Sequence, residues 1–130
     1  MTSSKLFDAA VKAAEKSYSP YSGFSVGAAL LTSDGKLFTG CNIENASYSL
    51  TICAERTAVF KAVSEGYKKF SAIAVAGSNN SDFSTPCSPC GACLQVLGEF
   101  CGDNMKIVLA DGEHFLSEFF PLRFSKENLK

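Results

Sequence analysis

The cysteines are the residues of this chain whose types and spacing most clearly suggest chemistry. Three of the six lie in "TPCSPCGACLQV", residues 85–96, where two C-x-x-C pairs overlap: Cys87 with Cys90 and Cys90 with Cys93. This spacing fits a zinc site, a redox dithiol or a disulfide. A chain of 130 residues buries enough surface to fold without cross-links. The pattern therefore favours a metal or redox role and leaves open which sulfurs take part.

Helix geometry favours the second pair. Ser is preferred at a helix cap and Pro at the first helical position, so Ser88-Pro89 predicts the start of a helix that runs to about Phe100. Cys90 and Cys93 would then lie three residues apart on one face and could reach one ion. Cys87 precedes this predicted helix, and by ligand count alone it stays an alternative fourth ligand.

A third sulfur and a carboxylate occur at another predicted helix start. Cys53 opens "CAERTAVFKAVSEG", which ends at Gly66, and a helix N-terminus stabilises a thiolate. Three thiolates from two helix starts predict a zinc site, and a missing fourth protein ligand is typical of a catalytic site that holds water. Glu55 follows Cys53 by two residues, so its carboxylate would lie beside the metal and suits a proton shuttle. Alone, it would only stabilise the helix dipole.

The elements that must position these groups alternate along the chain. Apolar residues at three- and four-residue steps predict a helix over residues 4–18, from Leu6 to Tyr18. Asp34-Gly35 between two strand-like segments predicts a hairpin, in which Asn42 and Glu44 share a side if the second strand continues. The expected strands cover 24–31, 36–43, 71–78 and 105–110, while 113–124 fits either strand or helix. This order predicts an α/β fold, a three-layer α/β/α sandwich around one mixed sheet, with residues 1–130 as a single domain.

Composition excludes several classes of function. Twelve basic against 13 acidic residues leave no electrostatic footprint for nucleic acid or an anionic membrane, and no apolar run is long enough for a membrane span. We expect a cytoplasmic protein that binds a small ligand, in which the cysteines remain reduced. Cys41, Cys87 and Cys101 are predicted to be apolar fillers or free thiols. The only histidine, His114, has no partner at ligand spacing and is predicted to lie at the surface.

Three motifs together resemble the small zinc-dependent cytidine deaminases: "YSPYSGFSVGAALLTSDG", "NIENASYSLTICAERTAVFKAVSEG" and "SPCGACLQV". The resemblance implies the same sandwich fold and one zinc ion per subunit on Cys53, Cys90 and Cys93. It implies that Glu55 protonates N3 of the pyrimidine, while water attacks C4, and then passes a proton to the departing ammonia. Cytidine and 2′-deoxycytidine would become uridine and 2′-deoxyuridine, in pyrimidine nucleoside salvage. Arg56 would bond a cysteine sulfur and compensate its charge.

The resemblance also implies how the nucleoside is bound. Asn42 and Glu44 match residues that hydrogen-bond the ribose 3′-hydroxyl, Phe24 matches an aromatic that packs on the base, and Ala54 matches a further substrate-binding position. Tyr48 and Phe124 match residues that complete a neighbouring subunit's site, which implies a homotetramer with composite active sites. Two positions depart from the family pattern: Leu94 stands where Arg is usual, and Phe120 where Leu commonly precedes the proline.

Other functions remain as alternatives. A related deaminase of an aminoacylated nucleoside antibiotic, of the blasticidin type, would share the zinc motif but not the ribose-binding "NIEN". Nucleic-acid-editing deaminases usually carry His-x-Glu at the first ligand and a basic surface, and neither is present. A structural zinc module with Cys87 as fourth ligand would leave Glu55 without a role. A redox dithiol formed by Cys87 and Cys90 or by Cys90 and Cys93 would leave both Cys53 and Glu55 without a role.

Overall fold

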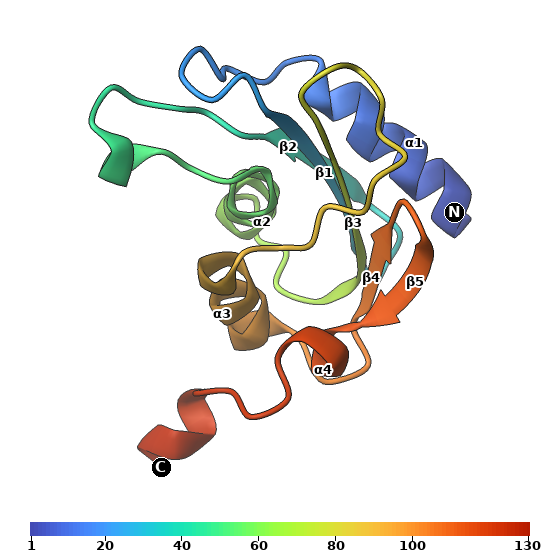
Figure 1. Ribbon diagram of the computed structural model, residues 1–130. Helices are drawn as coiled ribbons and strands as arrows, with labels where there is room; N and C mark the ends of the chain where they lie inside the picture. The colour runs from blue at the N-terminus through green and yellow to red at the C-terminus, as the bar shows by residue number, and fades with distance from the viewer.

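The computed structural model describes residues 1–130, which form a central sheet with helices on both faces (Figure 1). The helices are α1 (Ser3–Ala14), α2 (Ala54–Ser64), α3 (Gly91–Phe100) and α4 (Leu116–Phe119), with the 3-10 turns η1 (Tyr48–Leu50) and η2 (Lys126–Leu129). The strands are β1 (Ser25–Thr32), β2 (Leu37–Cys41), β3 (Phe70–Ser78), β4 (Lys106–Leu109) and β5 (Gly112–Phe115). The predicted α/β/α sandwich is thereby confirmed.

The five strands form one mixed sheet in the order β2-β1-β3-β4-β5. β1 runs antiparallel to both β2 and β3, β3 is parallel to β4, and β4 is antiparallel to β5. α3 lies on the crossover between the parallel pair, which is how parallel neighbours must be joined. The predicted hairpin turns at Gly35, whose φ of +93° is one that glycine adopts without strain.

The two faces of the sheet differ in the size of their side chains. Along β3, Ile73 and Val75 face the cluster beneath α2 and α3, whereas Ala72, Ala74 and Ala76 face α1. Small residues let α1 lie close to the sheet, and large residues fill the space under the other two helices. α1 therefore covers one face, while α2 and α3 lie side by side on the other (Figure 1).

Two boundaries differ from the sequence-based expectation, and one ambiguous segment is resolved. α1 ends at Ala14, and Tyr18 is instead an exposed bridge partner of Ile43. β2 ends at Cys41, before Asn42. The ambiguous C-terminal segment is strand β5 followed by one helical turn, α4.

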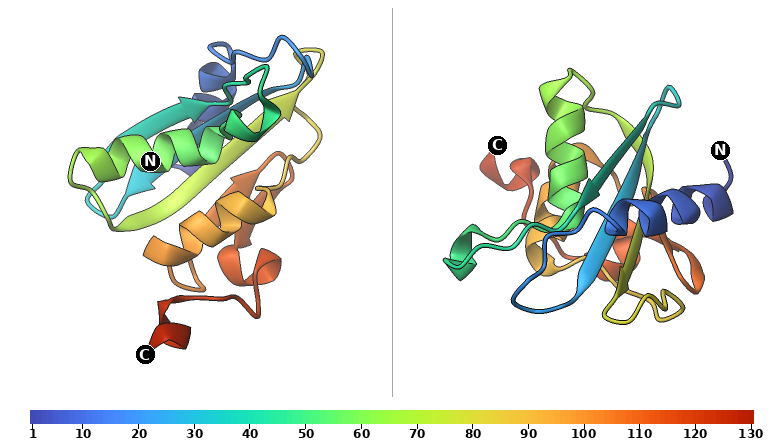
Figure 2. Two further views of the ribbon diagram at one scale, coloured as in Figure 1. Left: turned by 90° about the vertical axis from the view of Figure 1, so that its left-hand side faces the viewer. Right: turned by 90° about the horizontal axis from the view of Figure 1, so that it is seen from above.

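Two segments project from the body, namely residues 44–53 with η1 and the C-terminal tail with η2 (Figure 2). None of the helices has the length and apolar character needed to cross a membrane.

Gly40 on β2 determines how closely α2 can approach the sheet. A Cβ atom at this position would lie 2.6 Å from the backbone O of Ala54 and 2.6 Å from the backbone N of Ala58. We expect Gly40→Ala to lower the free energy of unfolding by about 1–3 kcal/mol, as overpacking does, because backbone rather than a flexible side chain would have to move. Urea unfolding followed by circular dichroism measures the change.

Gly98→Ala is the matched control, because its Cβ would meet only the Arg123 and Phe120 side chains, at 3.5 Å or more. Inside α3 this change should leave stability equal or raise it by up to about 1 kcal/mol. Equal unfolding free energies for wild type and Gly40→Ala would show that the backbone of α2 does not pack closely against Gly40.

Candidate functional site

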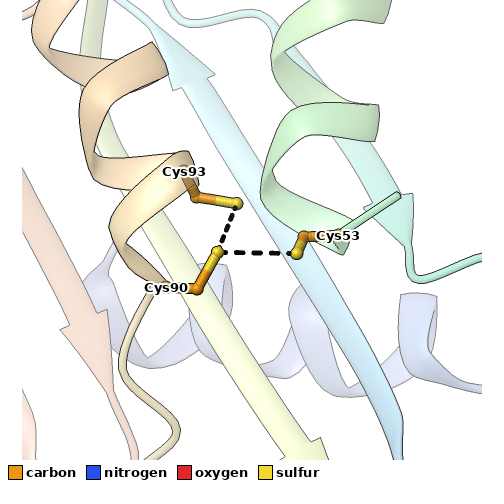
Figure 3. Close-up of side chains that lie close together, drawn as sticks. All are labelled: Cys53, Cys90 and Cys93. Atoms are coloured by element: carbon orange, nitrogen blue, oxygen red, sulfur yellow. Dashed lines mark hydrogen bonds between the residues drawn. The ribbon is translucent and has the colours of Figure 1, made fainter. Parts of the chain in front are cut away.

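Three cysteine sulfurs converge where the N-termini of α2 and α3 meet (Figure 3). The Sγ atoms of Cys53 and Cys90 are 3.6 Å apart, those of Cys90 and Cys93 are 3.5 Å apart, and all three lie within 4.8 Å of one another. Two sulfurs on a tetrahedral zinc ion, each with a Zn–S bond of about 2.3 Å, would be separated by about 3.8 Å. The cluster therefore has the spacing and the donor chemistry to hold one zinc ion.

Both helices present a cysteine at the N-cap. Cys53 caps α2 and Cys90 caps α3, each with extended backbone and without a side-chain capping bond. The prediction that Ser88-Pro89 begins α3 was therefore wrong, because the helix starts at Gly91 and both residues precede the cap. The predicted proximity of Cys90 and Cys93 survives, since cap and third helical residue also lie near one another. The positive ends of two helix dipoles point at the sulfurs and favour thiolates.

Cys87 and His114 lie outside this cluster. The potential metal-ligating group contains Cys53, Cys90 and Cys93 alone. Cys87 is half-buried and packs against the core beneath α2 and α3, as expected of an apolar filler. His114 Nε2 lies 2.8 Å from Asp111 Oδ1 near the protein surface.

Arg56 supplies a positive charge to the sulfurs. Its Nη2 donates to Cys53 Sγ at 3.4 Å. A hydrogen bond with Cys93 is the largest cause that lowers the pKa of Cys53. Burial opposes it, but the hydrogen bond from Arg56 adds to the lowering and the pKa lies well below its usual range. Leu94 is buried in the apolar cluster, so the position where the resemblance expects a second arginine carries no charge. Arg56 thus remains the cation in contact with the thiolates.

Glu55 lies beside the sulfurs in an apolar setting. Its residue is only 4% exposed, and burial is the largest cause that raises the pKa of its carboxyl group. It lines a cavity of about 200 Å³ together with Cys53, Cys90, Cys87, Ala54 and Asn42. A carboxyl group whose pKa is raised by burial next to a metal site is suited to take up and release a proton, as a general acid and base must.

A second cavity adjoins the first. It has a volume of about 380 Å³ and is lined by Tyr21, Ser22, Glu44, Tyr48 and Thr51. Thr51 also lines the cavity of Glu55, so the two share a wall. No lysine or arginine lines either cavity. The two adjoining cavities can therefore hold a neutral ligand that consists of two linked groups, one in each cavity.

Asn42 is held in place by two backbone groups and one serine hydroxyl. Its Oδ1 accepts from Val26 N at 2.9 Å and from the Ser17 hydroxyl, and its Nδ2 donates to Phe24 O at 2.8 Å. One Nδ2 hydrogen is left for a ligand. Asn42 and Glu44 share no continued strand, yet both side chains bond to residues of the 17–26 segment, as Glu44 accepts from Ser22. Sequence reasoning missed Ser22 and Thr51, because a lone hydroxyl in a loop carries no spacing signal.

None of the three predicted aromatic residues lines the cavity that contains Glu55. Phe24 and Cys87 both lie against Gly77 and are neighbours there. A Cβ atom added to Gly77 would be 2.8 Å from the side chain of each. Tyr48 lines the second cavity and is 75% exposed, and Phe124 is 59% exposed in the C-terminal tail. Gln95 Nε2 donates to Phe124 O at 2.9 Å and ties the tail to α3. The exposed aromatics are free to contact another molecule.

Replacing Arg56 tests its effect on the sulfurs. We expect Arg56→Gln to weaken zinc affinity by about 10- to 100-fold, the usual cost of losing a partner that bonds a metal ligand. Competition with a chromogenic chelator measures the affinity. Arg56→Lys keeps the charge but not the fork-shaped donor, so it should lose less. Wild-type affinity in Arg56→Gln would mean that the 3.4 Å contact is incidental.

Comparison with known proteins places this arrangement among deaminases. A family model described as "Cytidine and deoxycytidylate deaminase zinc-binding region" matches residues 1–109. A cytidine deaminase of Sporosarcina psychrophila is 50% identical over 130 residues, covering 96% of this chain and 93% of the relative. The crystal structure of cytidine deaminase from Burkholderia pseudomallei superposes with a TM-score of 0.85 at 46% identity, covering 95% of this chain and 100% of that one.

A blasticidin-S deaminase of Bacillus cereus is more distant. It is 30% identical over 108 residues, covering 78% of this chain and 77% of the relative. The chain is thus more similar to the cytidine deaminase, at 50% identity, than to the blasticidin-S deaminase, at 30%. This favours the cytidine deaminases over the antibiotic deaminases.

Proposed function

Because the chain belongs to the zinc-binding family of cytidine and deoxycytidylate deaminases, we propose that Cys53, Cys90 and Cys93 hold its zinc ion and that Glu55 moves the protons of the reaction. The chain is a zinc-dependent enzyme that deaminates cytidine to uridine with release of ammonia. The observation that carries the residue assignment is the buried Glu55 in a cavity lined by two of the three cysteines.

Proton transfer by Glu55 follows from its position and environment. Zinc, when bound, supplies the Lewis acidity that lets water act as a nucleophile near neutral pH. Glu55 accepts a proton from that water and donates it to N3 as C4 is attacked. It then carries the second proton to the amino group at C4, so that cytidine and water give uridine and ammonia. Burial supports this role by holding the pKa of Glu55 above its usual value.

The two cavities divide the substrate between them. The base lies in the smaller cavity beside Glu55, Ala54 and the sulfurs, and the ribose lies towards Asn42 and Glu44. Phe24 packs near the base. The absence of lysine and arginine from both linings favours a neutral nucleoside over a nucleotide, because neither cavity supplies a cation for a phosphate group. The same site accepts 2′-deoxycytidine, since no residue is assigned to the 2′-hydroxyl.

We further propose that residues 1–130 form one domain that assembles as a homotetramer with composite sites in the cytoplasm. The exposed Tyr48 and Phe124, both on projecting segments, support contributions to a neighbouring subunit. The six free cysteines support a reducing compartment. Native mass spectrometry of the full chain tests the assembly: four-chain particles are expected, and monomers alone would contradict it.

A direct assay tests the function. Zinc-replete protein is incubated with cytidine, and the loss of ultraviolet absorbance and the release of ammonia are followed together. We expect both signals in equal amounts. An absence of turnover by zinc-replete protein would refute the proposal, and turnover of blasticidin S but not cytidine would favour the antibiotic deaminase instead.

A further inference from the structure

The loop before β1 carries a serine that the proposed chemistry does not yet use. We propose that Ser22 is a positioning residue that fixes the Glu44 carboxylate for the substrate's ribose 3′-hydroxyl. This inference rests on the proposed function, in which Glu44 contacts the sugar. Ser22 itself does not touch the reacting atoms.

Ser22 and its neighbour engage both carboxylate oxygens of Glu44. The backbone N–H groups of Tyr21 and Ser22 donate to Glu44 Oε1 at 2.9 and 3.1 Å. The Ser22 hydroxyl donates to Oε2. These bonds favour the charged form and hold the pKa of Glu44 below its usual value, with the Ser22 hydroxyl as the largest cause. Glu44 is thus a fixed acceptor and not a mobile surface acid.

Counting lone pairs identifies the oxygen that is left for a ligand. Each carboxylate oxygen accepts about two hydrogen bonds, and Oε1 already has two. Oε2 has only the bond from Ser22 and therefore has room for one more donor. Because the Ser22 hydroxyl holds this same oxygen, it determines where the remaining acceptor site points.

The loop that carries Ser22 is anchored to the segment after β2 that carries Glu44. Glu44 N donates to Tyr18 O at 2.8 Å, and Tyr18 N donates to Asn42 O at 3.1 Å. Gly23 closes the loop with a φ of +69° and donates to Ser19 O at 3.0 Å. The Ser22 oxygen in turn accepts from Phe24 N at 3.0 Å, so one hydroxyl connects Glu44 to the start of β1. Ser22 is therefore held firmly enough to orient the Glu44 carboxylate.

Steady-state kinetics with two substrates test the proposal. We expect Ser22→Ala to raise KM for cytidine by about three- to tenfold, with kcat changed less than about twofold. This is the range for the net loss of one ordinary hydrogen bond, because the backbone N–H groups of Tyr21 and residue 22 still hold the Glu44 carboxylate. KM for 3′-deoxycytidine, which lacks the hydroxyl in question, should change by less than about twofold. Ser22→Thr, which keeps the hydroxyl, should restore most of the cytidine KM.

A double-mutant cycle separates positioning from general loop stability. In a Glu44→Gln background, Ser22→Ala should add little further change to KM for cytidine, because the two changes remove one interaction. Ser33→Ala, in the β1-β2 turn at the far end of the hairpin, is the control and should leave KM unchanged. Equal rises in KM for both substrates, full additivity in the cycle, or an unchanged cytidine KM would overturn the proposal. Wild-type protein without cytidine turnover would instead refute the proposed function.

Discussion

Glu55→Gln should abolish measurable turnover of cytidine while the protein keeps its zinc. One carboxyl carries out both proton transfers in the proposed reaction, and general acid–base catalysis contributes about 10²–10⁴-fold for a positioned group. We therefore expect kcat to fall on the order of 10⁴-fold. Gln fills the same space and can still hydrogen-bond, so the cavity of about 200 Å³ and the three sulfurs should be preserved. The ultraviolet assay measures kcat, and elemental analysis measures zinc.

A glutamate on the same helix provides the control. Glu65 is the exposed C-cap residue of α2, remote from the helix N-terminus that carries the sulfur of Cys53. Glu65→Gln should match wild type in both rate and zinc content. The proton-shuttle assignment is contradicted if Glu55→Gln retains more than about a tenth of the wild-type kcat, since that is far above what loss of a general acid–base group leaves.

The sequence predicted best those features that depend on local spacing. The alternation of apolar residues and the Asp34-Gly35 turn yielded the hairpin and the buried strands, because these patterns act over a few residues. The stop of α2 at Gly66, whose φ is +94°, was predictable for the same reason. Helix ends with competing signals were predicted less well. Pro89 favoured an earlier start for α3, but Cys90 takes the cap and so directs its sulfur towards Cys53.

Features that depend on contacts between distant segments required the structure. Cys53 and Cys90 are 37 residues apart in the chain, and helix composition predicts only that each opens a helix, not that the two N-termini meet. Their joint assignment to one zinc ion was inferred from the residue types at the two helix starts, and the family resemblance implied the same three cysteines. The hydrogen bonds that fix Asn42 and Glu44 come from Val26 near the start of β1 and from Ser22 in the loop before it, and no periodicity there indicates them. The burial of Leu94 was not predicted either. The family resemblance marked this position only as one where arginine is usual, and it therefore gave no indication that the side chain packs in the core.

Cys90→Ser should remove zinc from the protein. A serine hydroxyl does not ionise near neutral pH and is a much poorer ligand for zinc than a thiolate, so a three-sulfur site would lose a third of its donors. We expect zinc content to fall from about one ion to below about 0.1 per chain after dialysis, with loss of turnover. Cys90 is the most informative of the three because it is exposed, whereas Cys93 is fully buried and its replacement would also disturb packing. Inductively coupled plasma mass spectrometry measures the metal.

Cys87→Ser is the matched control, because it makes the same change in the overlapping C-x-x-C pair. Cys87 lies outside the ligand cluster, so this variant should keep about one zinc ion per chain. Added zinc should also raise the thermal midpoint of wild type and Cys87→Ser but not of Cys90→Ser, since only a protein that binds the ion in its folded state is stabilised by it. Equal zinc loss in Cys87→Ser and Cys90→Ser would make Cys87 a fourth ligand. The site would then be closed to water, and the structural zinc module would replace the enzyme as the better interpretation of the cluster.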